Sequence, residues 1–227
     1  MDLESTSDAS HVRVPKQHRS RASFERVLDA ATALLEEQGY SAFTLGEVSR
    51  RAKVSIGSIY GRIANKDDLL RAVQVRAFER MDAEFSSLIH RIRRRRLPLR
   101  ELIPLSVREL AHYFRRHAAL LGALMDAGQH DTVIQATGKH AYHVMAADFQ
   151  ALILERRAEI HHPDPQHAAA TVFSTVYASL ARYLGLASAK LAAGEGDWAE
   201  LVKDLGLIAL SFLLFDPRGL THEHRSS

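Results

Sequence analysis

The chain has 227 residues, of which 46% are hydrophobic and 25% are charged, with a formal net charge of +3 and no cysteine. This hydrophobic content excludes a disordered chain, and the length suffices for one or two domains with a substantial core. The absence of cysteine excludes disulfides, Cys-ligated zinc, iron–sulfur clusters and thiol catalysis. It agrees with a reducing compartment, so we expect a cytoplasmic protein.

Neither export nor membrane insertion is indicated. The start, MDLESTSDAS, is acidic and polar, whereas a signal peptide begins with a basic and then an apolar region. The longest apolar run, residues 205–215, is much shorter than the ~20 residues that span a bilayer. We therefore expect no membrane partner.

The net charge conceals an asymmetry along the chain. Residues 1–10 carry a net charge of −3, and residues 67–227 carry a net charge of +1. Residues 11–66 contain ten bases and five acids, which gives this stretch a net charge of +5. A small basic unit therefore precedes a larger, nearly neutral one.

Apolar residues recur every three or four positions along most of the chain, which predicts an all-α protein of about nine helices. The first helix carries an apolar stripe from Phe24 to Leu35 and ends near Gly39. Thr44 and Glu47 form a capping box at the start of the second helix.

Two further capping residues divide the following segment. After a break at 53–54, Ser55 is the predicted N-cap of a short third helix. Asn65 is the predicted N-cap of a fourth helix that extends toward Arg96. Five more helices are predicted at Arg100–Arg116, Ala118–Met125, Thr132–Ile160, Gln166–Ala192 and Asp197–Phe215. We expect Pro104 to start or kink the first of these.

This pattern predicts four regions: a disordered basic arm at 1–19, a helix-turn-helix domain at 20–66, a helical body at 67–216 and a disordered tail at 217–227. The spacing of the second and third helices is typical of a helix-turn-helix, which lays its second helix in the DNA major groove. An ordinary helical hairpin has the same spacing, so spacing alone leaves both interpretations open.

A longer sequence pattern distinguishes the helix-turn-helix from the ordinary helical hairpin. The run 30–73 reads AATALLEEQGYSAFTLGEVSRRAKVSIGSIYGRIANKDDLLRAV. It contains a Gly-Tyr at the end of the first helix, a Thr that starts the second, an Ile-Tyr in the third and a Lys and Leu-Leu early in the fourth. On these motifs, residues 24–73 resemble the DNA-binding domain of the TetR/AcrR family of bacterial transcription regulators.

The resemblance implies two classes of DNA contact. Phosphate contacts, which set the register of the protein on the duplex, are implied for Thr44, Ser55, Ser58, Tyr60 and Lys66. Base contacts are implied for Leu45, Gly46, Ile56, Gly57, Gly61 and Arg62. Among the latter only Arg62 carries strong donors for guanine, and it fits a phosphate contact equally well.

One departure from the family pattern has a conformational consequence. Lys53 occupies the turn where the family usually has glycine, so we expect a positive φ at a non-glycine residue.

The last two predicted helices are apolar on more faces than one subunit would cover, which predicts a homodimer. The family dimerises through such helices. The predicted interface consists of Phe173, Tyr177, Leu180, Leu184, Leu201, Leu205, Ile208 and Phe212. Burial of these residues within the monomer is the alternative.

The resemblance also implies a pocket for a small-molecule effector in the body. The candidate lining residues are the aromatic and Met side chains of the central helices: Met81, Phe85, Tyr113, Phe114, Met125, Tyr142, Met145 and Phe149. For each of them, ordinary core packing is the alternative. No charged residue stands out as an anchor, so an apolar or aromatic effector is the expectation.

Two polar clusters are given structural interpretations. The run 90–96, HRIRRRR, lies ~40 Å along the fourth helix from its start, so we expect a solvated basic surface far from DNA. The acids and histidines of 159–167 lie in a Pro-broken loop without regular ligand spacing, so we expect no metal.

Together these patterns predict a DNA-binding transcriptional regulator, and more specifically a dimeric repressor that binds a near-palindromic operator and is released by an effector. No Gly-rich phosphate loop, nucleophile elbow or HExxH motif supports an enzyme, and no cofactor is expected. A DNA-binding architectural dimer that senses no ligand is the alternative.

Overall fold

The computed structural model describes residues 16–186, 193–216 and 218, with side chains from Ser20 onward. In this part of the chain it contains eight α-helices, one 3₁₀ helix and no strand, which confirms the all-α prediction. The elements in chain order are α1 (Lys16–Gln38), α2 (Leu45–Ala52), α3 (Ile56–Tyr60), α4 (Lys66–Arg94), α5 (Leu99–Gly128), α6 (Thr132–Leu154), η1 (Arg157–Glu159), α7 (Pro165–Tyr183) and α8 (Trp198–Leu214).

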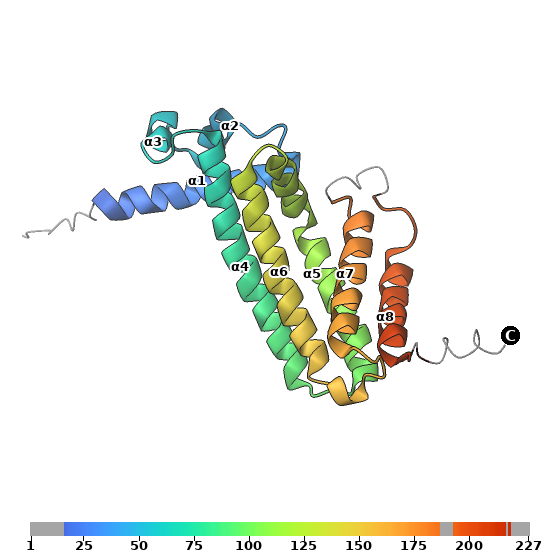
Figure 1. Ribbon diagram of the computed structural model, residues 1–227. Coiled ribbons are helices and arrows are strands. Elements are labelled where there is room, and N and C mark those ends of the chain that lie inside the picture. The colour runs from blue at the N-terminus through green and yellow to red at the C-terminus, as the bar shows by residue number, and fades with distance from the viewer. Residues whose placement is uncertain (1–15, 187–192, 217, 219–227) are drawn as a thin grey trace, which may run out of the picture.

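The head, which we define as α1–α3, lies at one end of the molecule (Figure 1). Helix α4 begins in the head and extends to the opposite end, and α5–α8 run beside it to form the body. Helix α1 packs against both α4 and α5, so that one continuous hydrophobic core joins head and body. Because of this shared core, the position of the head depends on the packing of the body helices.

Several predicted helix boundaries are wrong. The predicted helices Arg100–Arg116 and Ala118–Met125 are one continuous helix, α5, which also accommodates Pro104 in its interior. Helix α6 ends at Leu154 rather than at residue 160. Helix α7 ends at Tyr183, and Gly185 follows with φ of 66°. The predicted end of that helix, Ala192, lies outside the described residues.

Helix α1 begins at Lys16, so it includes the last four residues of the predicted basic arm. The rest of that arm, residues 1–15, lies outside the described residues. Of the predicted tail, 217–227, only residue 218 is described. Among the described helices, none is long and apolar enough to cross a bilayer.

Helices α5 and α8 approach each other closely at a glycine. A Cβ atom added to Gly206 would lie 3.2 Å from the Cα of Pro104. Because that neighbouring atom belongs to the backbone of α5 and cannot turn aside, a side chain at position 206 would push α8 away from α5. The glycine therefore lets α8 pack against α5 and completes that side of the body.

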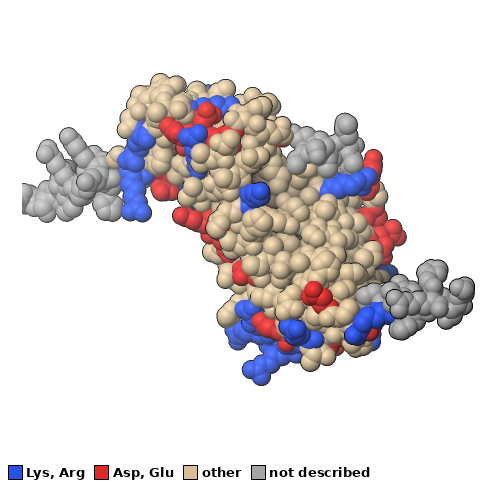
Figure 2. All heavy atoms as spheres, viewed as in Figure 1, with Lys and Arg blue, Asp and Glu red and all other residues tan. Residues whose placement is uncertain are grey.

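The basic run after Ile89 lies at the far end of α4 from α2 and α3, as predicted (Figures 1 and 2). Arg91, Arg93 and Arg94 occupy the last turn of α4, where basic side chains are favoured by the helix dipole. Arg93 also pairs with Glu155 at 2.5 Å. This basic surface is therefore far from the candidate DNA-binding surface.

Candidate nucleic-acid interface and cavity

The helix-turn-helix is fixed by local hydrogen bonds at its three caps, all of which were predicted. Thr44 Oγ1 accepts a hydrogen bond from the Glu47 N–H at 3.2 Å. Ser55 Oγ accepts one from the Ser58 N–H at 3.2 Å. Asn65 Oδ1 accepts one from the Asp68 N–H at 2.9 Å. Each cap satisfies a backbone N–H that the helix leaves unpaired.

The turn between α2 and α3 has the predicted left-handed residue. Lys53 has φ of 53° and ψ of 42°, although it is not glycine. Its N–H donates to the carbonyl of Arg50, and Ser49 Oγ donates to the carbonyl of Val54 at 2.7 Å. These bonds hold the angle between α2 and α3 and so set the direction of α3.

Helix α3 buries one side chain and exposes the others. Ile59 is buried, whereas Tyr60 is 53% exposed and Ile56 is 45% exposed. Gly57 and Gly61 are exposed as well. Large exposed apolar residues on a short helix leave a surface that fits contact with another molecule. Most of the residues predicted to contact DNA are therefore accessible to another molecule.

One predicted base contact is wrong. Leu45 is 9% exposed and packs with Val48 and Ala52 into the core of the head. Its side chain points inward because these three positions lie on one face of α2. Gly46, the next residue, is exposed, and no atom lies within 4 Å of the position that a Cβ would take.

Two of the predicted contacts use cations that rest on aromatic rings. The Arg62 guanidinium lies 5.2 Å from the centre of the Phe24 ring and also donates to Ser20 Oγ on α1. Lys66 Nζ lies 4.3 Å from the centre of the Tyr40 ring. Arg62 is therefore directed toward α1 rather than away from the protein, and reading a base would require its side chain to turn outward.

Ion pairs offset part of the positive charge of the head. Arg50 pairs with Glu47, and Arg51 pairs with Glu37 on α1. Hydrogen bonds from these arginines lower the pKa of both glutamates, which are therefore ionised at neutral pH. The number of basic residues in the head therefore overstates the number of cations that are free to meet DNA.

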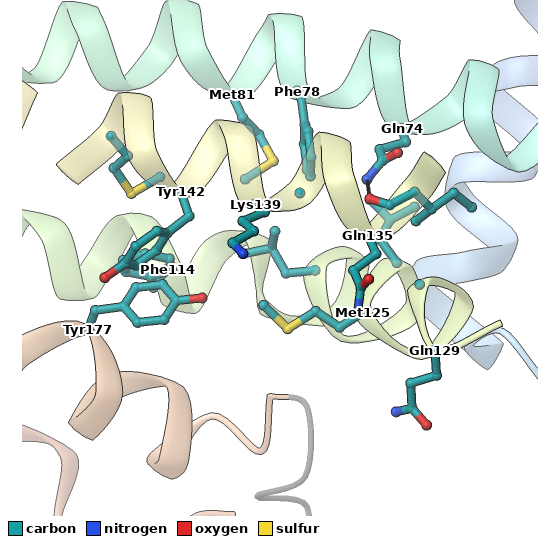
Figure 3. Close-up of a pocket in the computed structure, with 16 residues that line it drawn as sticks. Gln74, Phe78, Met81, Phe114, Met125, Gln129, Gln135, Lys139, Tyr142 and Tyr177 are labelled. Carbon is teal, nitrogen blue, oxygen red and sulfur yellow. Dashed lines mark hydrogen bonds between the residues drawn. The ribbon is translucent and has the colours of Figure 1, made fainter. Parts of the chain in front are cut away.

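The body contains a cavity of about 490 Å³ between α4, α5, α6 and α7 (Figure 3). This size lies in the usual range for small-molecule pockets. Its lining is mostly apolar and aromatic, with a few polar groups: Gln74, Phe78, Met81, Phe114, Leu121, Leu124, Met125, Gly128, Gln129, Ile134, Gln135, Gly138, Lys139, Tyr142, Met145 and Tyr177.

The structure places five of the predicted pocket residues on the lining: Met81, Phe114, Met125, Tyr142 and Met145. Three other predictions are wrong, because Phe85, Tyr113 and Phe149 are buried core residues that do not line the cavity. The Tyr113 hydroxyl instead donates to the Met81 carbonyl at 3.2 Å. Aromatic character alone did not distinguish the wall of the cavity from the core behind it.

The sequence prediction missed the polar residues of the cavity. Gln74 is 2% exposed, and its Nε2 donates to the Ile134 carbonyl at 2.8 Å. A polar residue within the apolar run of α4 was the available signal. Lys139 also lines the cavity, contrary to the expectation that no charged anchor exists. No salt bridge to Lys139 occurs among the described residues.

Tyr177, which was predicted for the subunit interface, lines the cavity. Its ring contacts Tyr142 and Phe114 in edge-to-face geometry, with centroids 4.8 and 5.3 Å apart. Burial, together with the neighbouring Tyr142, raises the pKa of the Tyr177 hydroxyl. It is therefore a neutral hydroxyl that can donate a hydrogen bond within the cavity.

A chain of polar contacts connects the start of α4 with the start of α6. Arg71 Nη1 lies 3.3 Å from Asp68, the residue whose N–H is capped by Asn65. Arg71 Nε donates to Asp131 Oδ2 at 2.9 Å. The other carboxylate oxygen of Asp131 caps α6 by accepting from Val133 and Ile134. The helix that carries Gln135 and Lys139 is thus tied directly to the helix that leaves the head.

The predicted interface residues divide between the core and the surface. Phe173, Leu180 and Leu205 are buried within the single chain, so they are not available to a partner, contrary to prediction. Leu184, Leu201 and Phe212 are half-buried. Ile208 is 56% exposed, and Leu207 and Phe215 are also exposed. A shallow apolar groove follows α7 and α8 and includes Val176, Ile208 and Phe212.

The loop of acids and histidines before α7 makes local contacts. Asp164 caps α7 by accepting from the His167 N–H at 3.0 Å. His162 Nδ1 contacts the backbone of Asp164. Within the described residues, no group of three or more His, Asp or Glu side chains is arranged to hold a metal ion.

Sequence comparisons place the head among bacterial regulators. The family described as "Bacterial regulatory proteins, tetR family" matches residues 27–73. The chain is 41% identical over 71 residues to the HTH-type transcriptional regulator HbdR of Aromatoleum sp. and 39% identical over 59 residues to the repressor KstR of Rhodococcus jostii. These matches cover 31% and 26% of this chain and only 30% and 28% of those relatives.

Structure comparisons extend the likeness of the fold to the body. A protein from Mesorhizobium loti, classed as a TetR-family transcriptional regulator, superposes with a TM-score of 0.69 at 17% identity, covering 86% of this chain and 96% of that one. FadR from Bacillus subtilis, solved in complex with stearoyl-CoA, superposes with a TM-score of 0.60 at 18% identity, covering 84% and 97%. The head of this chain thus matches the tetR family of bacterial regulatory proteins over residues 27–73, and the chain as a whole shares the fold of solved structures classed with that family.

Proposed function

We propose that this regulator is a repressor that binds a near-palindromic operator as a homodimer and leaves it when a small molecule occupies the body cavity. The observation that carries the proposal is the continuity of α4. This helix bears Lys66 at the head and, two to four turns later, Gln74, Phe78 and Met81 on the cavity wall. Any change of the cavity that moves α4 therefore moves a candidate DNA contact.

On the DNA side, the accessible surface of α3 would enter the major groove. Thr44, Ser55, Ser58, Tyr60 and Lys66 would contact phosphates. Ser55 and Ser58 share one hydrogen bond between their hydroxyls at 2.8 Å, which leaves one hydroxyl proton for a phosphate oxygen. Base reading would fall to Gly46, Ile56, Gly57, Gly61 and, after its side chain turns outward, Arg62.

Dimerisation would use the surface of α7 and α8, which lie at the edge of the body opposite α4 (Figure 1). Leu207, Ile208 and Phe215 are exposed there beside the apolar groove. Large exposed apolar residues grouped in this way mark an interaction surface. A two-fold dimer places two copies of α3 about one DNA turn (~34 Å) or slightly more apart, which requires a near-palindrome.

Release by an effector requires that the effector bind one arrangement of the heads more tightly than the other. The contact of Arg71 with Asp131 supports such coupling, because it joins α4 to the start of the cavity helix α6. Among the relatives, KstR is a repressor and FadR was solved with stearoyl-CoA. Both agree with a ligand-responsive repressor.

An architectural DNA-binding dimer that senses nothing is the alternative. The size of the cavity and its few convergent polar groups favour the sensing protein, because a purely architectural body has no need of such a space.

The test is a pull-down of genomic DNA fragments with the purified protein, repeated with a small-molecule library. We expect one or a few near-palindromic sequences to be enriched and at least one compound to release them. Tyr60→Phe and Lys66→Ala should each reduce enrichment, and sedimentation should give a dimer at micromolar concentration. Enrichment of no palindrome, with both variants binding as the wild type does, contradicts operator binding.

A further inference from the structure

The polar groups of the cavity are unevenly distributed. Buried Met81, Phe114, Leu121 and Leu124 form the inner, apolar part of its wall. Gln129, Gln135 and Lys139 are exposed, so they mark the side that faces solvent. The cavity is therefore amphipathic, with an apolar interior and a polar rim.

The rim carries one sign of charge. Lys139 is the single charged residue on the described lining, and no Asp or Glu lines the cavity there. Lys139 has no salt bridge within the described part of the chain, whereas Arg71, near the same helix, pairs with both Asp68 and Asp131. An ammonium at the edge of an apolar space attracts an anion more strongly than it would in open water.

Lys139 and Gln135 are placed to act together. They lie four residues apart on α6, so both side chains lie on the same face one turn apart. Figure 3 shows both extending from α6 toward the α5 side of the cavity, while Gln129 points away from it.

We propose that the cavity binds an organic acid with an apolar body, whose carboxylate is held at the rim by Lys139 and the Gln135 amide. The body of the ligand lies against Phe78, Phe114 and Met125. This inference deepens the proposed function, on which it rests for the role of the cavity, by assigning the chemical class of the effector.

The test measures binding to the full chain without DNA by isothermal titration calorimetry. The probes are decanoate, its methyl ester and decylammonium, which share one apolar body and differ in charge. Biphenyl-4-carboxylate and its amide repeat the comparison with a rigid aromatic body. For at least one body, we expect the acid to bind at least about tenfold more tightly than its neutral or cationic counterpart.

Variants assign the effect to Lys139. Lys139→Met keeps the length of the side chain and removes its charge, so the affinity for the acid should fall about ten- to hundredfold while the ester is unaffected. Lys139→Glu should reverse the preference in favour of decylammonium. Lys203→Met, at an exposed lysine of α8 outside the cavity, is the matched control and should bind as the wild type does.

Equal affinity for acid and neutral counterpart with both bodies, no binding of either acid, or an unchanged affinity of Lys139→Met would overturn the inference. DNA release is measured separately with the enriched operator. An acid that binds through Lys139 without releasing DNA supports the ligand class and contradicts effector-controlled release. A neutral compound that binds the cavity and releases DNA, while no acid binds, supports effector-controlled release and contradicts the ligand class.

Discussion

The head and the body of this protein are stabilised by contacts that span different distances along the chain. The starts of α2 and α3 in the head, and of α4 where it leaves the head, are each fixed by a side chain three residues away, at Thr44, Ser55 and Asn65. In the body, the defining contacts cross about 60 residues, as from Gln74 to the Ile134 carbonyl and from Arg71 to Asp131. The head is thus a unit of local signals, whereas the body depends on packing between distant helices.

The comparisons show the same division. The matched family segment is confined to residues 27–73, and the body is like its solved neighbours in fold at 16–18% identity. A surface that must fit the regular DNA backbone tolerates little change, whereas a cavity for an effector is free to differ between regulators. The division teaches that the fold of the body carries little information about its ligand, which has to be argued from its own side chains.

The largest expected effect is on body packing. Gly206→Val would place a branched side chain against the backbone of Pro104, where even a Cβ lies at 3.2 Å. Overpacking of this kind costs about 1–3 kcal/mol, so the urea midpoint should fall clearly. Gly122→Ala is the matched control, since its Cβ would meet only the Leu186 side chain at 3.8 Å and should not destabilise the protein. Equal midpoints for both variants would show that α8 is not closely packed on α5.

The next effect concerns the surface of the head. Tyr60→Ala should weaken operator binding about tenfold, because a phosphate contact and apolar contact area are both lost. Its melting temperature should stay at the wild-type value, since the side chain is 53% exposed. Fluorescence anisotropy with the enriched operator measures the affinity. Val133→Ala, at a body residue 51% exposed, should leave DNA binding unchanged. A Tyr60→Ala protein that binds DNA normally would remove α3 from the interface.

The same division explains what sequence reasoning could predict. The caps, the left-handed Lys53 and the recognition of the family all depend on residues close together in the chain. The continuity of α5 was missed at residues 116–118, where two separate helices were predicted, because the contacts that keep α5 unbroken there come from helices distant in the sequence. Pro104 was expected to start or kink this helix because proline lacks a backbone N–H, but α5 begins at Leu99 and continues through it.

The site was predictable to the extent that it is local. Tyr60 and Ile56, which the resemblance implies as DNA contacts, are exposed, but the inward direction of Leu45 was not anticipated. In the body, Phe114 and Phe149 look alike in the sequence, and only the packing of α4–α7 puts Phe114 on the cavity and Phe149 in the core. Lys139 was missed because a lysine on a helix usually marks a solvated face.

A smaller expected effect is the pH dependence of stability that Asp131 contributes through its contact with Arg71. Burial raises the pKa of Asp131, but hydrogen bonds from Ile134, Arg71 and Val133 outweigh it, so the pKa lies below its ordinary value of 3.8. The carboxylate therefore stabilises the folded state at pH above about 4, and this contribution is lost as pH falls through the lowered pKa.

Asp131→Asn keeps a capping side chain but loses the ion pair with Arg71, so its stability should depend less on pH below 4 than that of the wild type. Urea midpoints between pH 3 and pH 7 measure the difference. Asp67→Asn, at an exposed acid in the first turn of α4, is the matched control. Parallel pH curves for wild type and Asp131→Asn would contradict a lowered pKa at Asp131.

The smallest expected effect compares the two left-handed residues, one in each region. Lys53 in the head has φ of 53° and Arg96 at the end of α4 has φ of 50°. The left-handed conformation costs a non-glycine residue about 1–2 kcal/mol, which exceeds the roughly 0.5–1 kcal/mol that glycine loses in backbone entropy. Lys53→Gly and Arg96→Gly should therefore each stabilise by about 0.5–1 kcal/mol. Hydrogen exchange locates the gain: because head and body share one core, both variants should slow exchange in both regions. A gain confined to the head in Lys53→Gly would show that the head opens independently of the body.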